Sequence, residues 1–314
     1  MTRTMTAETG AAGDGAAQTG AAKVGTDVNR RSMMGRLGAG AVSAAALSAV
    51  AAGGLVASAQ PAQAQTVTDA DILNFALNLE YLEAEFYLRA YFGTGLGSSD
   101  VTGTGAAGGV TGGSQVPFRS QAIQQYCQRL ASDELTHVRF LRTALGSAAV
   151  ARPQIDLVNS FNTLGVAAGL IVAGQTFNPF ADDVSFLLGA FIFEDVGVTA
   201  YAGAARLISN KDYLEAAAGI LAVEAYHAGS IRTLLANLGA GIAVNKISAA
   251  RAAAGNGKEQ GITVPGNNYN AVAADSNSLA FRRTTGEVLN IVYIGGASGG
   301  FGFFPNRVNG TIQA

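Results

Sequence analysis

Histidine occurs only twice in this 314-residue sequence, and each histidine stands three residues after a glutamate. The two motifs are Glu134-x-x-His137 and Glu224-x-x-His227. On an α-helix, residues three apart share a face, so each motif presents a carboxylate beside an imidazole. Any site that uses histidine must include one or both of these positions. The pattern therefore favours a helical fold that brings two such faces together.

The composition excludes several other classes of protein. With 49% apolar and 13% charged residues, the chain does not have the composition of an intrinsically disordered protein. Cys127 is the single cysteine, which excludes a disulfide framework and a four-thiolate metal site. We expect this thiol to pack in the core. The balance of 20 basic and 22 acidic residues gives no electrostatic basis for nucleic-acid binding.

The first 64 residues have the organisation of a signal peptide. A basic region around Arg30-Arg31 precedes an apolar run of small residues at 37–59, and an Ala-x-Ala pattern ends at Ala64. The paired arginines resemble those of a twin-arginine leader. We expect cleavage after Ala64 and export to the periplasm or the cell exterior, with no stable membrane span afterwards. An uncleaved anchor is the alternative, because the apolar run could almost span a bilayer.

Four segments show the apolar spacing of helices, at about 69–91, 119–145, 182–208 and 211–238. The third is apolar on nearly all sides, which is typical of a buried helix. The last two are joined by only a few residues, so they should be antiparallel neighbours. The first connection, 93–115, contains 9 glycines and is predicted to be a flexible surface loop. The second, 147–180, is long enough to cross the bundle, and we expect a short helix near 167–173.

The composition changes after residue 239, where clusters of Gly, Asn and Thr begin. We interpret 240–314 as a mostly irregular C-terminal tail that packs on the bundle, with a helix near 287–292. The predicted organisation is a leader at 1–64, a four-helix bundle at 65–239 and this tail.

The four helices resemble a duplicated pair. Glu80 is followed seven residues later by Tyr87, and Glu194 is followed seven residues later by Tyr201. Four further positions agree when the two Glu-x-x-His motifs are aligned. We expect each tyrosine to pack in the core and to hydrogen-bond a site residue.

The glutamates of this pattern lie inside apolar helical runs, where an isolated carboxylate would be very costly to bury. A metal ion or another charge must compensate their charge, and the alternative to metal is that His137 and His227 are ordinary core histidines bonded to their glutamates. A Glu from each of two helices and a Glu-x-x-His from each of the other two form the ligand set of di-iron and di-manganese bundles. The pattern therefore predicts two divalent metal ions, iron or manganese, bound by Glu80, Glu134, His137, Glu194, Glu224 and His227.

Four other acidic residues lie near the predicted ligands in the sequence, and we expect them to occupy positions outside the ligand set. Glu83 shares the face of Glu80 and is expected close to the ligands, whereas Glu85 is expected to face solvent or the tail. Asp195 points about 100° away from Glu194, which favours a place beside the ligands or at the surface. Asp133 is expected to be exposed.

The sequence resembles the ferritin-like superfamily in these motifs. It is more closely similar to exported ferritin-like-domain proteins related to plant desiccation-related proteins, through the segments 77–87, 279–284 and 288–293. The resemblance implies an all-α, ferritin-like four-helix bundle and a role in stress.

Three classes of function fit the predicted centre. One is an exported di-metal oxidoreductase acting on O₂, peroxide or ferrous iron. Another is a non-catalytic stress protein that keeps its metals for structure or sequestration. A two-metal hydrolase is less favoured, because no further histidine is present for acid–base chemistry. The sequence leaves the oligomeric state open, and a homo-oligomer is one alternative.

Overall fold

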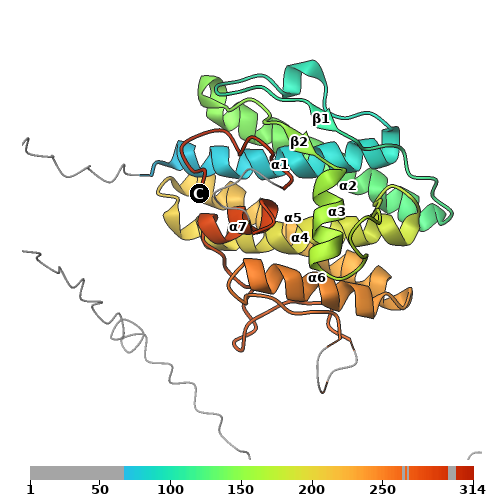
Figure 1. Ribbon diagram of the computed structural model, residues 1–314. Helices are drawn as coiled ribbons and strands as arrows, with labels where there is room; N and C mark the ends of the chain where they lie inside the picture. Colours follow the sequence, from blue (N-terminus) through green and yellow to red (C-terminus); the bar gives the residue numbers. More distant parts are fainter. Residues whose placement is uncertain (1–66, 264–265, 267–268, 296–301) are drawn as a thin grey trace, which may run out of the picture. The chain divides into compact units, whose positions relative to one another are not determined.

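The computed structural model describes residues 67–263, 266, 269–295 and 302–314, so the predicted leader lies outside the described residues. Four long helices form a bundle in which α1 packs on α2, α4 packs on α5, and α1 packs on α4 (Figure 1). Their bounds are Asp69–Phe92 for α1, Gln121–Leu145 for α2, Asp183–Ala204 for α4 and Lys211–Asn237 for α5. The predicted all-α four-helix bundle is confirmed.

Local capping chemistry sets the ends of these helices close to the predicted positions. Thr68 and Asp71 form a capping box at the start of α1, which ends at Gly93 in the left-handed conformation (φ 77°). Side chains of Asp182 and Asn210 accept hydrogen bonds from the first amides of α4 and α5. The third predicted helix is shorter than expected, because α4 ends at Ala204 and continues only as a 3₁₀ turn, η4 (Ala205–Leu207).

Helix α4 is the central element of the core and contacts α1, α5, α6 and α7. Among the described residues, Asp183–Leu207 is the one helical segment long and apolar enough to cross a membrane by length and composition. Of its most apolar stretch, 89% is buried inside the protein. This segment therefore has the burial of a core helix. Cys127 of α2 is also buried, as predicted.

The connection between the first two helices lies at the surface, as predicted, and it contains short regular elements that were not predicted. This connection contains a 3₁₀ turn, η2 (Ser98–Asp100), and a short strand, β1 (Val110–Thr111). Strand β1 pairs in parallel with β2 (Ile155–Asp156) of the second connection. Some of the glycines serve close packing, since a Cβ at Gly103 would lie 2.3 Å from the Ala149 carbonyl oxygen.

The second connection contains a helix, but not at 167–173. Helix α3 spans Asn159–Ala167. It begins here because Asp156 Oδ1 accepts hydrogen bonds from the amides of Val158 and Asn159. Soon after its end the chain passes through Gly169 with φ 66°, a left-handed conformation that stops a helix.

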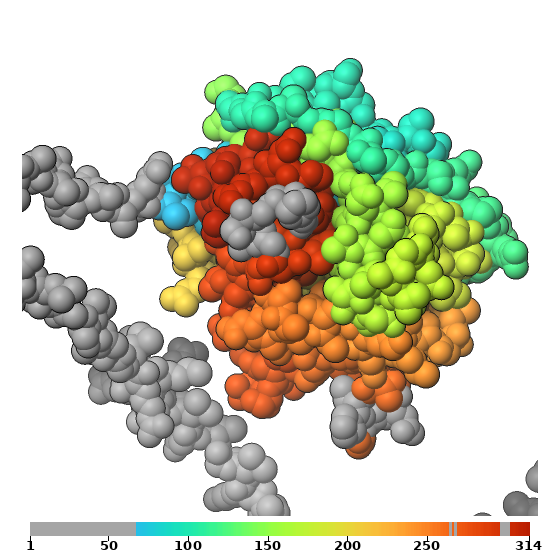
Figure 2. Space-filling model, viewed as in Figure 1, coloured from blue at the N-terminus to red at the C-terminus, as the bar shows by residue number. Residues whose placement is uncertain are grey.

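The C-terminal tail is more regular than predicted. It contains the expected short helix, α7 (Thr285–Val292), and a 14-residue helix, α6 (Gly241–Ala254), that was not predicted. Both helices pack on α4. Phe303 is buried and its ring contacts Phe161 and Phe193 at 5.0 and 4.9 Å between centroids. Figure 2 shows described parts of the tail, in orange and red, packed closely against the rest of the molecule. The tail thus completes one wall of the core.

Candidate metal centre

The six predicted site residues come together in the middle of the bundle. Helices α1 and α4 each contribute a glutamate, and α2 and α5 each contribute a Glu-x-x-His motif. None is more than 8% exposed. Their donor atoms form two groups, each with all atoms within 4.8 Å of one another: Glu80, Glu134, His137 and Glu224 in one, and Glu134, Glu194 and His227 in the other.

Both imidazoles present the same nitrogen to the cluster. Nδ1 of His137 lies 3.0 Å from Glu134 Oε2 and 3.2 Å from Glu80 Oε2. Nδ1 of His227 lies 3.2 Å from Glu134 Oε1 and 3.2 Å from Glu194 Oε2. Glu134 therefore directs one carboxylate oxygen to each half of the cluster, which is the arrangement of a bridging carboxylate.

Four carboxylate oxygens in the cluster are buried and form no hydrogen bond among the described residues, although two of them, Glu80 Oε2 and Glu134 Oε1, each lie 3.2 Å from a histidine Nδ1. They are Glu80 Oε2, Glu134 Oε1 and both oxygens of Glu224. Unpaired buried charge is strongly unfavourable unless a metal or another charge compensates it. Carboxylate oxygens and imidazole nitrogens together suit divalent iron or manganese. The donor set therefore fits a pair of such ions.

In the absence of metal, the burial of several carboxylates and imidazoles close together shifts their pKa values. Burial raises the pKa of Glu80 to about 7 and raises the pKa of Glu224 well above its usual range. Burial acts to lower the pKa of His137, but the neighbouring Glu80 and Glu134 carboxylates raise it to about 11. Without metal, the cluster therefore holds protons that partly neutralise its charge.

Two tyrosines position the glutamates of the opposite helix. The Tyr87 hydroxyl of α1 donates to Glu194 Oε1 of α4 at 2.6 Å. The Tyr201 hydroxyl of α4 donates to Glu80 Oε1 of α1. Both tyrosines are buried, as the sequence predicted. Burial raises both pKa values well above 10, so the hydroxyls remain protonated donors.

The prediction that Asp133 is exposed is wrong. Its side chain is only 13% exposed, and its Oδ2 lies 3.1 Å from His227 Nε2. Arg129 Nε donates to the same oxygen at 2.7 Å. Asp133 directly precedes Glu134 and so points about 100° around α2, towards α5. The position of Asp133 next to Glu134 in the sequence could have indicated a place near the site. The packing of α5 against Asp133 could not be predicted from the sequence.

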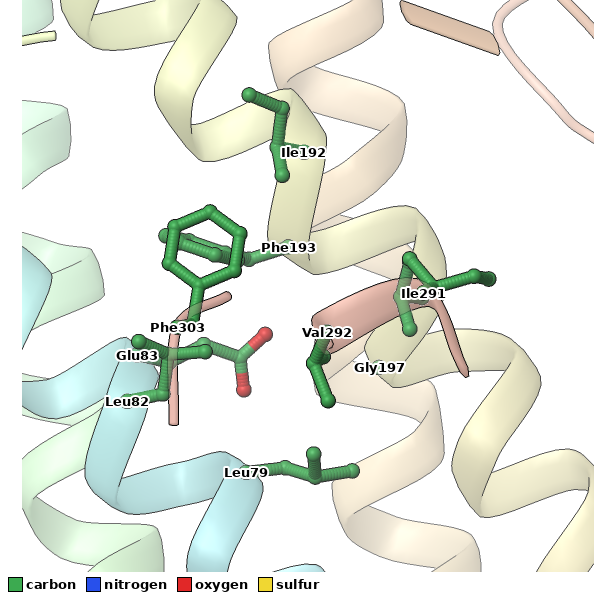
Figure 3. Close-up of a pocket in the computed structure, with 10 residues that line it drawn as sticks. Leu79, Leu82, Glu83, Ile192, Phe193, Gly197, Ile291, Val292 and Phe303 are labelled. Atoms are coloured by element: carbon green, nitrogen blue, oxygen red, sulfur yellow. The ribbon is translucent and has the colours of Figure 1, made fainter. Parts of the chain in front are cut away.

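Glu83 lies next to the cluster, as expected, and faces a small apolar cavity. Figure 3 shows its carboxylate pointing into a cavity of about 20 Å³, enough for one water-sized molecule. A Cβ at Gly197 would lie 2.2 Å from Glu224 Oε2 and 3.4 Å from Glu83 Oε1, so the cavity borders the cluster. The other lining residues are Leu79, Leu82, Ile192, Phe193, Val196, Ile291, Val292 and Phe303.

Glu85 is not exposed to solvent, contrary to the sequence prediction. It is buried between two arginines, Arg89 of the same helix and Arg152 of the second connection. Their guanidinium groups compensate the carboxylate, so this acid has no need of a metal. The contribution of Arg152, 67 residues away, had no signal in the local sequence.

Asp195 lies behind the cluster in a buried ionic network. It binds Arg232 Nη2 at 3.0 Å and Arg251 Nη2 at 2.8 Å. Arg251 and Arg283 also bind Glu259, at 2.8 and 3.0 Å. Burial acts to raise the pKa of Asp195, but the arginines hold it below its usual value. The network joins α4 and α5 to the tail.

Comparisons with known proteins agree with this architecture. The sequence matches the ferritin-like domain family over residues 68–237. It is 34% identical over 240 residues to "Desiccation-related protein PCC13-62" of Craterostigma plantagineum, covering 69% of this chain and 75% of that protein. It is 31% identical over 268 residues to "Ferritin-like catalase Nec2" of Nesocodon mauritianus, covering 78% of this chain and 84% of that protein.

Proposed function

Because the chain belongs to the ferritin-like domain family, we propose that it is a redox-active di-metal carboxylate protein. The observation that carries this proposal is the set of buried carboxylate oxygens without hydrogen-bond partners, which converge with two imidazole nitrogens. The proposed ligands of two divalent iron or manganese ions are Glu80, Glu134, His137, Glu194, Glu224 and His227.

When bound, the two ions would supply redox chemistry toward O₂, peroxide or ferrous iron. The chain's own residues bind the ions, and Tyr87 and Tyr201 fix two of the carboxylates by hydrogen bonds. Apolar side chains exclude bulk water from the adjoining cavity, whose size suits a molecule of very few atoms. The name of one relative, a ferritin-like catalase, supports peroxide as a substrate. The name of the other supports a role in stress.

Elemental analysis after reconstitution with iron or manganese tests this proposal. We expect about two metal ions per chain. The variant Glu134→Ala/Glu224→Ala should bind less than one, while the exposed control Glu215→Ala should match the unmutated protein. Less than one ion per chain in the unmutated protein would refute the proposal. Bound metal without turnover of peroxide, O₂ or ferrous iron would favour the non-catalytic stress protein.

Metal binding should tighten as the pH rises from about 6 to about 8. Glu80, with a pKa of about 7, carries a proton at the lower pH that a metal ion must displace, and His137 releases a proton at either pH. Calorimetric titration with Mn²⁺ in two buffers of different ionisation enthalpy measures both the affinity and the protons released. An affinity that falls over this pH range would contradict the assignment of these ligands.

We also propose that the chain is exported by the twin-arginine-like leader predicted at 1–64. N-terminal sequencing of protein recovered from the exported fraction should begin at Gln65. A start at Met1 would contradict cleavage at this position. Replacing Arg30-Arg31 by two lysines should retain the precursor in the cytoplasm, which immunoblotting of cell fractions would detect.

A further inference from the structure

The two halves of the centre differ at the residue that precedes each Glu-x-x-His motif. Glu134 and His137 of α2 correspond to Glu224 and His227 of α5, and all four are buried in the same cluster. The residue before Glu134 is Asp133, whereas the residue before Glu224 is Val223. One half therefore carries a carboxylate where the other carries an aliphatic side chain.

That carboxylate fixes the imidazole of the opposite motif. His227 Nε2 lies 3.1 Å from Asp133 Oδ2, and Arg129 holds the same oxygen at 2.7 Å. With Nε2 as the hydrogen-bond donor, the lone pair of Nδ1 is directed at the cluster, 3.2 Å from Glu134 Oε1 and Glu194 Oε2. Such a partner sets the tautomer and the orientation of a metal-binding histidine.

His137 has no equivalent support. Its Nδ1 faces Glu80 and Glu134, but its Nε2 has no hydrogen-bond partner in the part of the chain that the structure describes. Its side chain is 10% exposed, against 5% for His227. Val223, in the position that corresponds to Asp133, has no polar side-chain atom to offer.

We infer that the two metal positions are unequal, and that Asp133 makes the position at His227 the tighter one. This inference rests on the proposed di-metal function and adds an order of filling to it. Asp133 acts as a positioning residue through His227. Partners of this kind change metal affinity by roughly 10- to 100-fold when they are removed. We therefore expect the two affinities to differ by about that factor.

Substoichiometric loading tests the order of filling directly. Crystals of metal-free protein soaked with one equivalent of Mn²⁺ per chain should show anomalous scattering beside Glu194 and His227, with little beside Glu80 and His137. Calorimetric titration with Mn²⁺ should resolve two affinities. Equal occupancy, or filling of the His137 position first, would overturn the inference while leaving the di-metal proposal intact. If no Mn²⁺ or Fe²⁺ binds at all, both are refuted.

Substitutions at Asp133 and Val223 distinguish the positioning role of Asp133 from a general effect of charge. Asp133→Val should weaken the tighter position by about 10- to 100-fold and so bring the two affinities together. Val223→Asp should strengthen the His137 position, because the new carboxylate would occupy the sequence position that corresponds to Asp133. A uniform strengthening of both positions by Val223→Asp would show a charge effect and would overturn the role of Asp133. Glu215→Ala is the surface control and should change neither affinity.

Discussion

Loading with two divalent ions should raise the melting temperature of the protein by roughly 10–20 °C. At a free metal concentration 100 times the dissociation constant, each site adds about 2.7 kcal/mol to the free energy of unfolding. For a domain of this size, each kcal/mol corresponds to about 2–4 °C. Differential scanning calorimetry with excess Mn²⁺ and with a chelator measures the shift.

The variant Glu134→Gln/Glu224→Gln should show little of this metal-dependent rise in melting temperature. It should lose most of the metal-dependent shift, because two of the six proposed ligands are altered. The metal-free form of the single variant Glu224→Gln should melt above the metal-free unmutated protein, since both oxygens of Glu224 have no hydrogen-bond partners and burial among other carboxylates raises the pKa of Glu224 well above its usual range. A metal-dependent shift of the same size in both proteins would contradict the ligand assignment. A metal-free Glu224→Gln variant that is less stable than the unmutated protein would contradict the view that the Glu224 carboxylate destabilises the metal-free bundle.

The second large effect is expected at the buried network behind the centre. Asp195→Ala should lower the free energy of unfolding by about 3–5 kcal/mol, the usual loss when one partner of a buried ion pair is removed. Without Asp195, the buried guanidinium groups of Arg232, Arg251 and Arg283 would have only Glu259 as a neighbouring carboxylate in the network. Urea denaturation of metal-free protein measures this loss apart from any change in metal binding.

The contribution of Asp195 also has a defined pH dependence. Its folded-state pKa is below the ordinary value of 3.8, so its stabilisation is complete above that value and is lost as the pH falls through the lower folded pKa. The difference between Asp195→Ala and the unmutated protein should therefore be constant near neutral pH and shrink in acid. Glu215→Ala, an exposed substitution on α5, should change stability by less than about 0.5 kcal/mol. A loss as small as that for Asp195→Ala would contradict the role of the network.

The sequence predicted the part of the site that depends on helical periodicity. The three- and seven-residue spacings repeat on paired helices, so Glu80, Glu134, Glu194 and Glu224 could be selected before their positions were known. Partners supplied by distant segments could not be selected in this way. The burial of Glu85 could not be predicted, because its partner Arg152 comes from the second connection.

The same distinction applies to the fold. The four bundle helices have strong apolar periodicity and clear caps, so their limits were predicted to within a few residues. Helix α6 was missed because the Gly- and Asn-rich segments around it dominate the composition of the tail. What stabilises α6 is its packing on α4, where Arg251 lies 4.1 Å over the ring of Phe191. Tertiary contacts of this kind leave little trace in a local pattern.

The crossed tyrosine contacts make the two helical hairpins mutually dependent. The α1–α2 hairpin contains Tyr87 but uses it to hold Glu194, whereas Glu80 is held by Tyr201 of the α4–α5 hairpin. Neither hairpin alone has a complete set of supports for its own carboxylate. A chain cut within the second connection should therefore regain metal binding only when both fragments are present together. A lone hairpin could assemble such a centre only by pairing with a second hairpin across an approximate two-fold axis.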